Sequence, residues 1–171
     1  EGGFYARSKK AAEDYIEEFK NIYGLNYTIL RFGSLYGERS DNNNAIRSIV
    51  YNAIKKKKLI YRGRKDAARR YINVEDAAMA CIEVIDKKYD NKYVTIAGNK
   101  QVKIKKIFNV LSNYFKIPKK NMKFLNEKYT GHYNIKPTTF KARVGKSLII
   151  KKQKDFVVSL LKLTKKMENF I

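Results

Sequence analysis

Apolar side chains recur every three or four residues between Ser8 and Tyr23, and charged side chains fill many of the positions between them. This period is typical of an amphipathic helix with one apolar face. Gly24 follows at the position where a helix C-cap belongs. The next apolar stretch, Tyr27 to Phe32, is short and rich in β-branched and aromatic residues, which predicts a buried strand.

The same two periods continue along the rest of the chain. Further helices are predicted over Ala45–Lys55, from Glu75 through Ile85, over Ile104–Phe115 and over Lys154–Glu168. Further strands are predicted over Leu59–Tyr61, Tyr71–Val74 and Tyr93–Ala97. Residues 119–152 show neither period clearly. Strands that alternate with helices indicate an α/β fold.

The composition is that of a folded domain. The chain has 171 residues, of which 44% are hydrophobic, so it can bury a core. No apolar run approaches the roughly 18 residues that a membrane-spanning helix needs, and no signal peptide opens the chain. The expected compartment is therefore the cytoplasm. A single cysteine and a single histidine argue against a disulfide framework and against a metal site.

The chain is strongly basic, with a formal net charge of +22 from 38 Lys and Arg against 16 Asp and Glu. Such a balance raises the hypothesis of a nucleic-acid-binding protein. Two features weigh against it. The lysines are spread along the whole chain, and Lys, Asn, Ile and Tyr are abundant together, as a nucleotide bias toward A and T would produce. Part of the charge also suits an anionic small substrate, so nucleic-acid binding stays the alternative.

Tyr5 and Lys9 are four residues apart where the first helix begins. Residues at this spacing lie on one face of a helix, with Cβ atoms about 5–6 Å apart. An ammonium that close favours the ionised phenolate. A tyrosine tuned in this way can take a proton from a hydroxyl, or return one, near neutral pH, as hydride transfer between an alcohol carbon and a nicotinamide requires. Alone the spacing is weak evidence, because Tyr61 and Lys65 repeat it.

Three motifs follow one another in the first half of the chain. Residues 5–13 read Tyr-Ala-Arg-Ser-Lys-Lys-Ala-Ala-Glu, residues 30–37 read Leu-Arg-Phe-Gly-Ser-Leu-Tyr-Gly, and residues 69–78 read Arg-Arg-Tyr-Ile-Asn-Val-Glu-Asp-Ala-Ala. In order and spacing they resemble the active-site helix, a strand and turn, and a later segment of the extended short-chain dehydrogenase/reductase family. The resemblance is to its NAD(P)-dependent sugar-nucleotide epimerases and dehydratases, such as the UDP-glucose 4-epimerases.

The resemblance implies the C-terminal part of a Rossmann-type extended short-chain dehydrogenase with its small α/β substrate-binding lobe. Residues 1–38 would be the end of the NAD(P)-binding Rossmann domain with its catalytic helix. Residues 39–171 would be mainly the lobe, with 69–86 packing back on the Rossmann part. None of the nine glycines forms the family's Gly-x-x-Gly-x-x-Gly turn. We therefore expect a fragment that is inactive alone and binds cofactor poorly.

The resemblance also assigns the catalytic and cofactor-binding residues. Tyr5 matches the general acid/base, and Lys9 matches the lysine that holds the nicotinamide ribose and supports the tyrosine; both therefore also bind the cofactor. Phe32, Gly33 and Leu35 match the turn that lies along the nicotinamide. The implied cofactor is NAD, with NADP as the alternative.

Three further positions match substrate-binding residues. Ser34 stands where many members place an asparagine that touches the sugar nucleotide, and serine is shorter. Asn44 matches an asparagine that binds the nucleotide diphosphate at a helix start, and a plain helix cap is an equal reading. Arg69 matches the arginine that clamps the diphosphate, a role that suits a bidentate guanidinium. Arg70 departs from the family's aspartate and adds positive charge.

The function that the resemblance implies is an NAD-dependent nucleoside-diphosphate-sugar 4-epimerase acting by transient hydride transfer. A sugar-nucleotide 4,6-dehydratase or a keto-sugar reductase is the first alternative. A non-catalytic nucleic-acid-binding module on the same scaffold is the second. Family members commonly dimerise through two helices, which implies a homodimer of the intact protein with the 8–23 helix at its interface.

Overall fold

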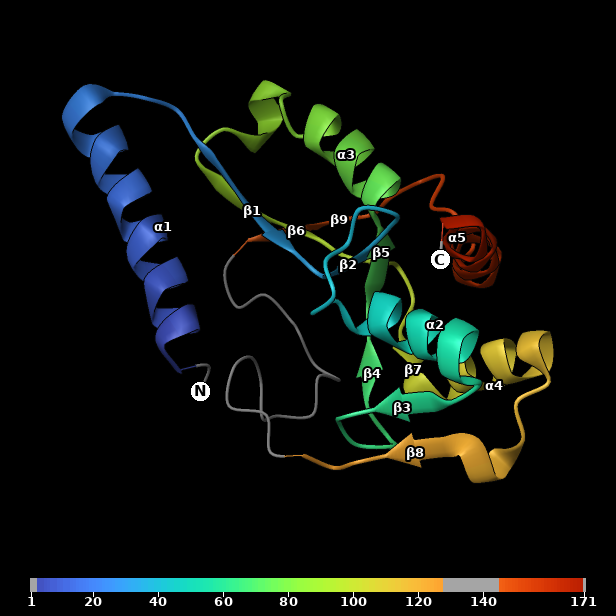
Figure 1. Cartoon of the computed structure of the whole chain (residues 1–171). Helices are drawn as coiled ribbons and strands as arrows, with labels where there is room; N and C mark the ends of the chain where they lie inside the picture. The colour runs from blue at the N-terminus through green and yellow to red at the C-terminus, as the bar shows by residue number, and fades with distance from the viewer. Residues whose placement is uncertain (1–2, 128–144, 171) are drawn as a thin grey trace.

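The computed structural model describes residues 3–127 and 145–170, in which helices alternate with short strands (Figure 1). The helices are α1 Gly3–Tyr23, α2 Ala45–Lys56, α3 Val74–Glu83, α4 Ile104–Phe115 and α5 Phe156–Phe170, with 3-10 turns at Lys87–Tyr89 and Lys119–Asn121. The strands are β1 Thr28–Phe32, β2 Ser34–Tyr36, β3 Leu59–Tyr61, β4 Ala68–Arg69, β5 Tyr71–Asn73, β6 Lys92–Ile96, β7 Val102–Lys103, β8 Met122–Phe124 and β9 Lys146–Leu148. Among the described residues, no helix is both long and apolar enough to cross a membrane.

The largest sheet of the described part has three parallel strands in the order β1-β6-β9. Phe32 pairs with Ile96, and Ile96 pairs with Leu148. Because the strands are parallel, these three residues mark the carboxyl ends of the strands at one edge of the sheet. In α/β sheets, ligands bind outside this edge. Functional side chains are therefore expected beside these three residues.

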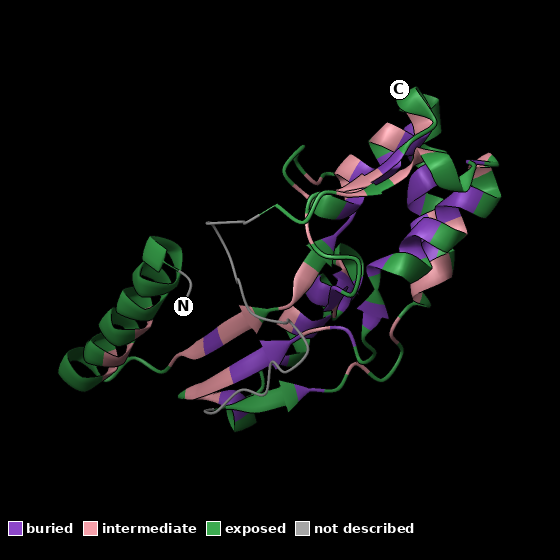
Figure 2. Cartoon of the chain, turned by 90° about the horizontal axis from the view of Figure 1, so that it is seen from below, coloured by how far each residue is buried: buried purple, intermediate pink, exposed green. Residues whose placement is uncertain are grey.

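Helices lie on both faces of this sheet (Figure 1). On one face, α3 packs through a small core of buried residues made of Ile72, Ala77, Ala80, Val84, Tyr89, Val94, Ile96 and Leu148. On the other face lies α1, which contacts Arg31 of β1 and Tyr93 of β6. Figure 2 shows that α1 is exposed along nearly its whole length. The two faces of the sheet are thus covered in physically different ways.

A second and larger core lies between α2, α4, α5 and the parallel pair β3–β8. Phe108 and Leu111 of α4 are fully buried in it and meet Ile49 of α2. Strand β5 joins the two cores, because successive side chains of a strand point to opposite sides. Tyr71 belongs to the second core and its neighbour Ile72 to the first.

The α/β fold class is confirmed, and the helices agree closely with their predicted ranges. The helix predicted over Ile104–Phe115 is α4, and those predicted over 45–55 and 154–168 are α2 and α5 with small shifts at their ends. The first helix begins at Gly3, five residues before the predicted Ser8. Gly24 adopts a positive φ of 68° after it, as a helix C-cap requires.

The expectation that residues 27–32 form a buried strand was wrong. None of the described residues of α1 is buried either, so the described part of the chain does not cover its predicted apolar face. In β1, predicted to be a buried strand, only Ile29 is buried, and Phe32 is 41% exposed. β1 has charged residues of α1 on one face and no neighbouring described strand on its outer edge, so most of its residues stay accessible.

Sequence patterns predicted the short strands β3 and β5 but missed five others, which are β2, β4, β7, β8 and β9. Each has two or three residues, too few to show a period of two. Strands β6 and β9 both join the sheet of β1, so that sheet draws on residues beyond the predicted 69–86 segment. The division into residues 1–38 and 39–171 stays a prediction.

Candidate active site at the carboxyl edge of the sheet

The side of α1 that faces the sheet is charged. Glu13, Glu17 and Lys20 are partly buried, and every other described residue of the helix is exposed. These spacings of four and three place the three side chains on one face of the helix. The contact between helix and sheet is therefore polar rather than apolar.

Arg31 and Tyr93 meet this charged face from neighbouring strands. Arg31 Nε donates to Glu13 Oε1 at 2.8 Å, and Arg31 Nη2 donates to Glu13 Oε2 at 2.7 Å. The guanidinium lies over the Tyr93 ring, 4.5 Å from its centroid, and the Tyr93 hydroxyl donates to Glu17. The side chains of Arg31 and Glu13 are 28% and 14% exposed, so solvent screens this pair less than a surface pair.

These contacts fix how far along β1 the helix lies. Tyr93 pairs with Ile29, so Glu17 lies level with position 29 of β1, and Glu13 lies level with Arg31. Four residues of helix rise about 6 Å, and two residues of strand rise about 6.6 Å. The helix and the strand therefore run antiparallel, and between these two contacts four residues of the helix span nearly the same distance as two residues of the strand.

The predicted catalytic pair lies on the N-terminal part of the same helix. Lys9 is about one helical turn, and Tyr5 about two turns, further toward the N-terminus than Glu13. The Lys9 Nζ lies 5.5 Å from the Tyr5 ring centroid, a cation–π contact. Tyr5 is 47% exposed, so its side chain is accessible from solvent at this end of α1.

The turn after β1 has little room at Gly33. Its N–H donates to the Ile96 carbonyl at 2.8 Å, and a Cβ on this glycine would lie 2.8 Å from both the Arg70 carbonyl oxygen and the Ala97 Cβ. The Ser34 N–H donates to the same Arg70 carbonyl at 3.3 Å. Glycine therefore lets the 32–35 turn approach the segment that carries Arg69 and Arg70.

Apolar side chains at the turn stay accessible. Phe32 is 41% exposed and Leu35 is 38% exposed, both at the edge where the parallel strands end. Together with Gly33 they offer an apolar surface next to the carboxyl ends of β1 and β6. Such a surface can take the flat face of a ring.

Asn44 is the N-cap of α2. Its Oδ1 accepts from the N–H groups of Ile46 and Arg47 at 3.1 and 3.2 Å. Its Nδ2 donates to the Leu35 carbonyl at 2.8 Å, which ties the cap to the turn. The structure therefore shows the helix-cap role, and Asn44 already occupies two of the N–H groups that were expected to meet an anion.

Arg69 is half-buried in β4, where it pairs with Val102 of β7. It makes no ion pair within the described residues. The next residue, Arg70, supplies the carbonyl that Ser34 contacts. The structure thus brings the backbone of Arg69–Arg70, the 32–35 turn and Asn44 together through hydrogen bonds. Tyr5 and Lys9 contact each other on α1, and their place in a shared site stays a prediction.

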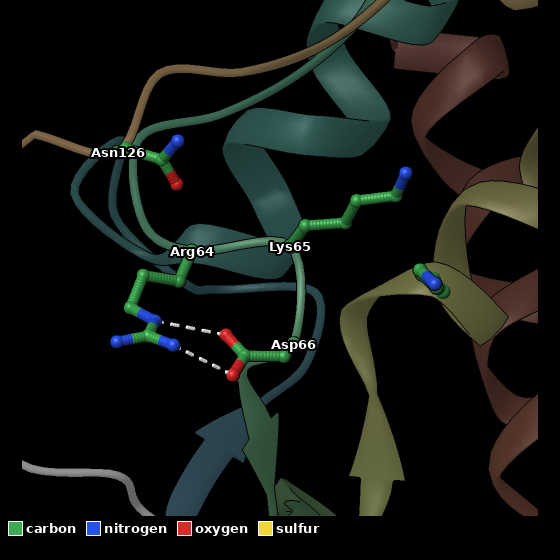
Figure 3. Close-up of a pocket in the computed structure, with 5 residues that line it drawn as sticks. Arg64, Lys65, Asp66 and Asn126 are labelled. Carbon is green, nitrogen blue, oxygen red and sulfur yellow. Dashed lines mark hydrogen bonds and ion pairs between the residues drawn. The ribbon is translucent and has the colours of Figure 1, made fainter.

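A hollow of about 500 Å³ opens beside the loop between β3 and β4 (Figure 3). It is lined by Arg64, Lys65, Asp66, Lys105 and Asn126. Arg64 donates to both Asp66 carboxylate oxygens at 2.9 Å, and Lys65 extends away from that pair. No predicted site residue lines this hollow, so it is separate from the candidate active site.

The sequence interpretation missed the contacts that orient α1. An arginine in the middle of a strand predicted to be buried was a signal, because a buried charge needs a partner. Glu13 could have been predicted as that partner, because it is only 18 residues from Arg31 on the preceding helix. Glu17 and Tyr93 are 76 residues apart, and nothing in the sequence connects them.

The family follows from comparison with known proteins. The sequence profile of the NAD dependent epimerase/dehydratase family matches residues 2–97, which is more than half of the chain. The chain belongs to this family. The predicted resemblance is thereby confirmed.

Relatives of this epimerase/dehydratase chain share parts of its sequence. It is 36% identical over 85 residues to UDP-glucuronate 4-epimerase 1 of Arabidopsis thaliana, which is 48% of this chain and 20% of the relative. It is 29% identical over 112 residues to a protein of Methanocaldococcus jannaschii provisionally named UDP-glucose 4-epimerase, which is 64% of this chain and 36% of the relative. The chain thus spans about a third or less of these proteins.

Solved structures share the fold. The UDP-glucuronic acid 4-epimerase of Bacillus cereus superposes with a TM-score of 0.78 at 14% identity, over 98% of this chain and 53% of that chain. The dTDP-glucose 4,6-dehydratase of Bacillus anthracis gives a TM-score of 0.77 at 19% identity, over 98% and 52%. These likenesses confirm the Rossmann-type fold of this epimerase/dehydratase family member.

Replacing Asn44 tests its structural role. Asn44→Ala removes both cap hydrogen bonds and the bond to Leu35, so we expect the free energy of unfolding to fall by about 1–2 kcal/mol in urea denaturation. Asn44→Asp keeps a cap acceptor and should recover most of that loss. An alanine variant as stable as the parent chain would contradict the cap role.

The Tyr93–Glu17 hydrogen bond predicts a pH dependence of stability. This bond, with partial burial and the nearby carboxylates, raises the pKa of Tyr93 above its ordinary value. Unfolded tyrosine ionises near pH 10, so the stabilisation is complete below about pH 10 and is lost as the pH rises toward the higher folded pKa. Tyr93→Phe should therefore cost about 1 kcal/mol near pH 7 and less at pH 11, measured by urea unfolding at both. A cost that does not shrink with pH would rule out this linkage.

Proposed function

We propose that the protein is an NAD-dependent nucleoside-diphosphate-sugar 4-epimerase. The observation that carries the proposal is the contact of Lys9 with Tyr5 on α1, the helix whose Glu13 and Glu17 bind side chains of β1 and β6 in the parallel sheet. Membership of the epimerase/dehydratase family supports it. Because the chain spans only part of its relatives, the proposed activity is that of the whole protein.

Tyr5 is the proposed general acid/base. Its hydroxyl takes the proton of a sugar hydroxyl and later returns it, a role that requires an accessible phenol next to the bound substrate. Tyr5 is 47% exposed, which gives its hydroxyl access to a substrate. The Lys9 ammonium lies over the Tyr5 ring in a cation–π contact that keeps the two side chains together.

The residues at this edge fit a nicotinamide cofactor. Phe32 and Leu35 present apolar side chains, and Gly33 lacks the Cβ that would clash with its neighbours in the turn. We propose that these residues lie along the nicotinamide ring and that Tyr5 and Lys9 hold its ribose. NAD, when bound, supplies the group that accepts a hydride from the sugar carbon and gives it back.

The proposed substrate contacts lie on the elements next to the turn. Ser34 and Arg69 are on segments linked by the Ser34–Arg70 hydrogen bond, and a guanidinium suits a diphosphate. The Oδ1 atom of Asn44 caps α2, and one hydrogen of its Nδ2 bonds to the Leu35 carbonyl. The proposed contact of Asn44 with the diphosphate therefore uses the second Nδ2 hydrogen.

We propose the domain division as predicted, with residues 1–38 in the cofactor-binding domain and 39–171 mainly in the substrate-binding lobe. The two separate cores support a division of this kind. We further propose that the 171 residues alone turn over no substrate, because their glycines form no dinucleotide-binding turn. Adding NAD and sugar nucleotide to the isolated chain tests this directly, and turnover would contradict it.

A sugar-nucleotide 4,6-dehydratase is the second candidate. The observation that favours it is 28% identity over 99 residues to the dTDP-glucose 4,6-dehydratase of Escherichia coli, which is 58% of this chain and 27% of that protein. A product assay separates the two, because an epimerase product keeps the mass of the sugar and a dehydratase product loses one water.

We also propose that the whole protein is a homodimer with α1 at the interface. The outer side of this helix exposes large apolar side chains, with Tyr15 at 71%, Phe19 at 54% and Ile22 at 63%. An exposed apolar stripe of this kind marks an interaction surface. Phe19→Glu together with Ile22→Glu should convert a dimer into a monomer in sedimentation analysis, and an unchanged mass would contradict this interface.

Substitution of Tyr5 tests the catalytic proposal. In the whole protein, Tyr5→Phe keeps the ring and loses the proton-transferring hydroxyl, so we expect kcat for C4 inversion to fall about 100- to 10,000-fold. Tyr51→Phe makes the same change at an exposed position of α2, outside the proposed catalytic and interface residues, and should leave kcat unchanged. A Tyr5→Phe enzyme with full activity would rule out the assigned role.

A further inference from the structure

We infer that Arg31 is a positioning residue, whose ion pair with Glu13 sets the place of Tyr5 and Lys9 against the sheet edge. The inference rests on the proposed function, because it concerns how the proposed catalytic pair is held. Arg31 itself is level with Glu13, two helical turns from Tyr5, so it acts on the site through the helix.

The helix needs such a contact because, within the described residues, no apolar side chain of α1 is buried against the sheet. No described residue of α1 is buried, and its inner face consists of Glu13, Glu17 and Lys20. An apolar interface would fix the helix by the fit of many side chains. Here a small set of directional polar contacts does so instead.

These polar contacts are spread along α1. At its C-terminal end, Lys20 Nζ donates to Asn26 Oδ1 at 2.9 Å, and Asn26 Nδ2 donates to Asp90 Oδ2 at 3.1 Å. Glu17 comes next along the helix and Glu13 after it. The Glu13 pair is thus nearer to the catalytic end than the Glu17 and Lys20 contacts are.

Arginine is suited to this task in three ways. Its two nitrogens hold both carboxylate oxygens of Glu13, which fixes the angle as well as the distance. The plane of the guanidinium rests over the Tyr93 ring, so the arginine is itself held by β6. A lysine would keep the charge and lose the bidentate geometry.

A small tilt of α1, allowed by loss of the Glu13 contact, becomes a larger displacement at Tyr5. Glu17 is twelve residues from Tyr5, so a rigid helix pivoting there has an arm of about 18 Å. A tilt of about 5° then moves Tyr5 by about 1.5 Å over that arm. Misplacing a catalytic group by about 1 Å can lower a rate about 100-fold.

The test is kinetic and uses the whole protein. Arg31→Met and Glu13→Gln should each lower kcat about 10- to 100-fold, with little change in KM, because substrate contacts lie on other elements. Arg31→Lys should recover part of the loss. Asp14→Asn is the matched control, because Asp14 is next to Glu13 but pairs with Lys10 on the exposed side of the helix, and its kcat should not change.

A distance measurement separates this inference from the proposed function. Nitroxide labels at Arg7→Cys on α1 and Lys100→Cys after β6, with Cys81→Ser, report the position of the helix without any substrate. Arg31→Met and Glu13→Gln should shift or broaden the distance distribution, and Asp14→Asn should not. An unchanged distribution, or unchanged kcat in an active enzyme, would overturn the positioning role. A shifted distribution in a protein that turns over no sugar nucleotide would support the positioning role and refute the proposed function alone.

Discussion

The ion pair between Arg31 and Glu13 is the contact on which the candidate active site depends. It joins α1 to β1 on the side of the helix that presents charged side chains to the sheet, while the apolar side chains of α1 point outward. Two hydrogen bonds to one guanidinium fix distance and angle together. Because a helix is a rigid rod with a constant rise, the geometry at Glu13 determines where Lys9 and Tyr5 lie.

The rest of the site is assembled by the sheet and by the two cores. Parallel pairing of β1 with β6 brings the turn after Phe32 to the edge where α/β proteins bind ligands. Strand β5 contributes Tyr71 to one core and Ile72 to the other, which links the two cores. The proposed catalytic residues and the proposed substrate contacts therefore sit on differently stabilised elements that meet at one edge.

The sequence was sufficient for the features that depend on local patterns. Helix α4 was predicted at its observed bounds because its buried residues recur with helical period, and the three motifs indicated the family. Features that depend on distant residues were beyond such patterns. Strand β9 has only three residues and is defined by its pairing with β6, and the Tyr93–Glu17 bond spans 76 residues. Asn44 shows a third case, because cap and ligand roles favour the same residue type, and only the observed hydrogen bonds reveal the cap.

The most direct test of the account is to purify the whole protein and assay it with UDP-, GDP- and dTDP-linked sugars, following C4 inversion by NMR. The bound dinucleotide would be identified in the same sample by absorbance and mass. The account predicts co-purifying NAD and inversion of at least one sugar nucleotide without change of mass. A protein with intact Tyr5 and Lys9 that holds no nicotinamide cofactor and inverts none of these sugars would contradict it.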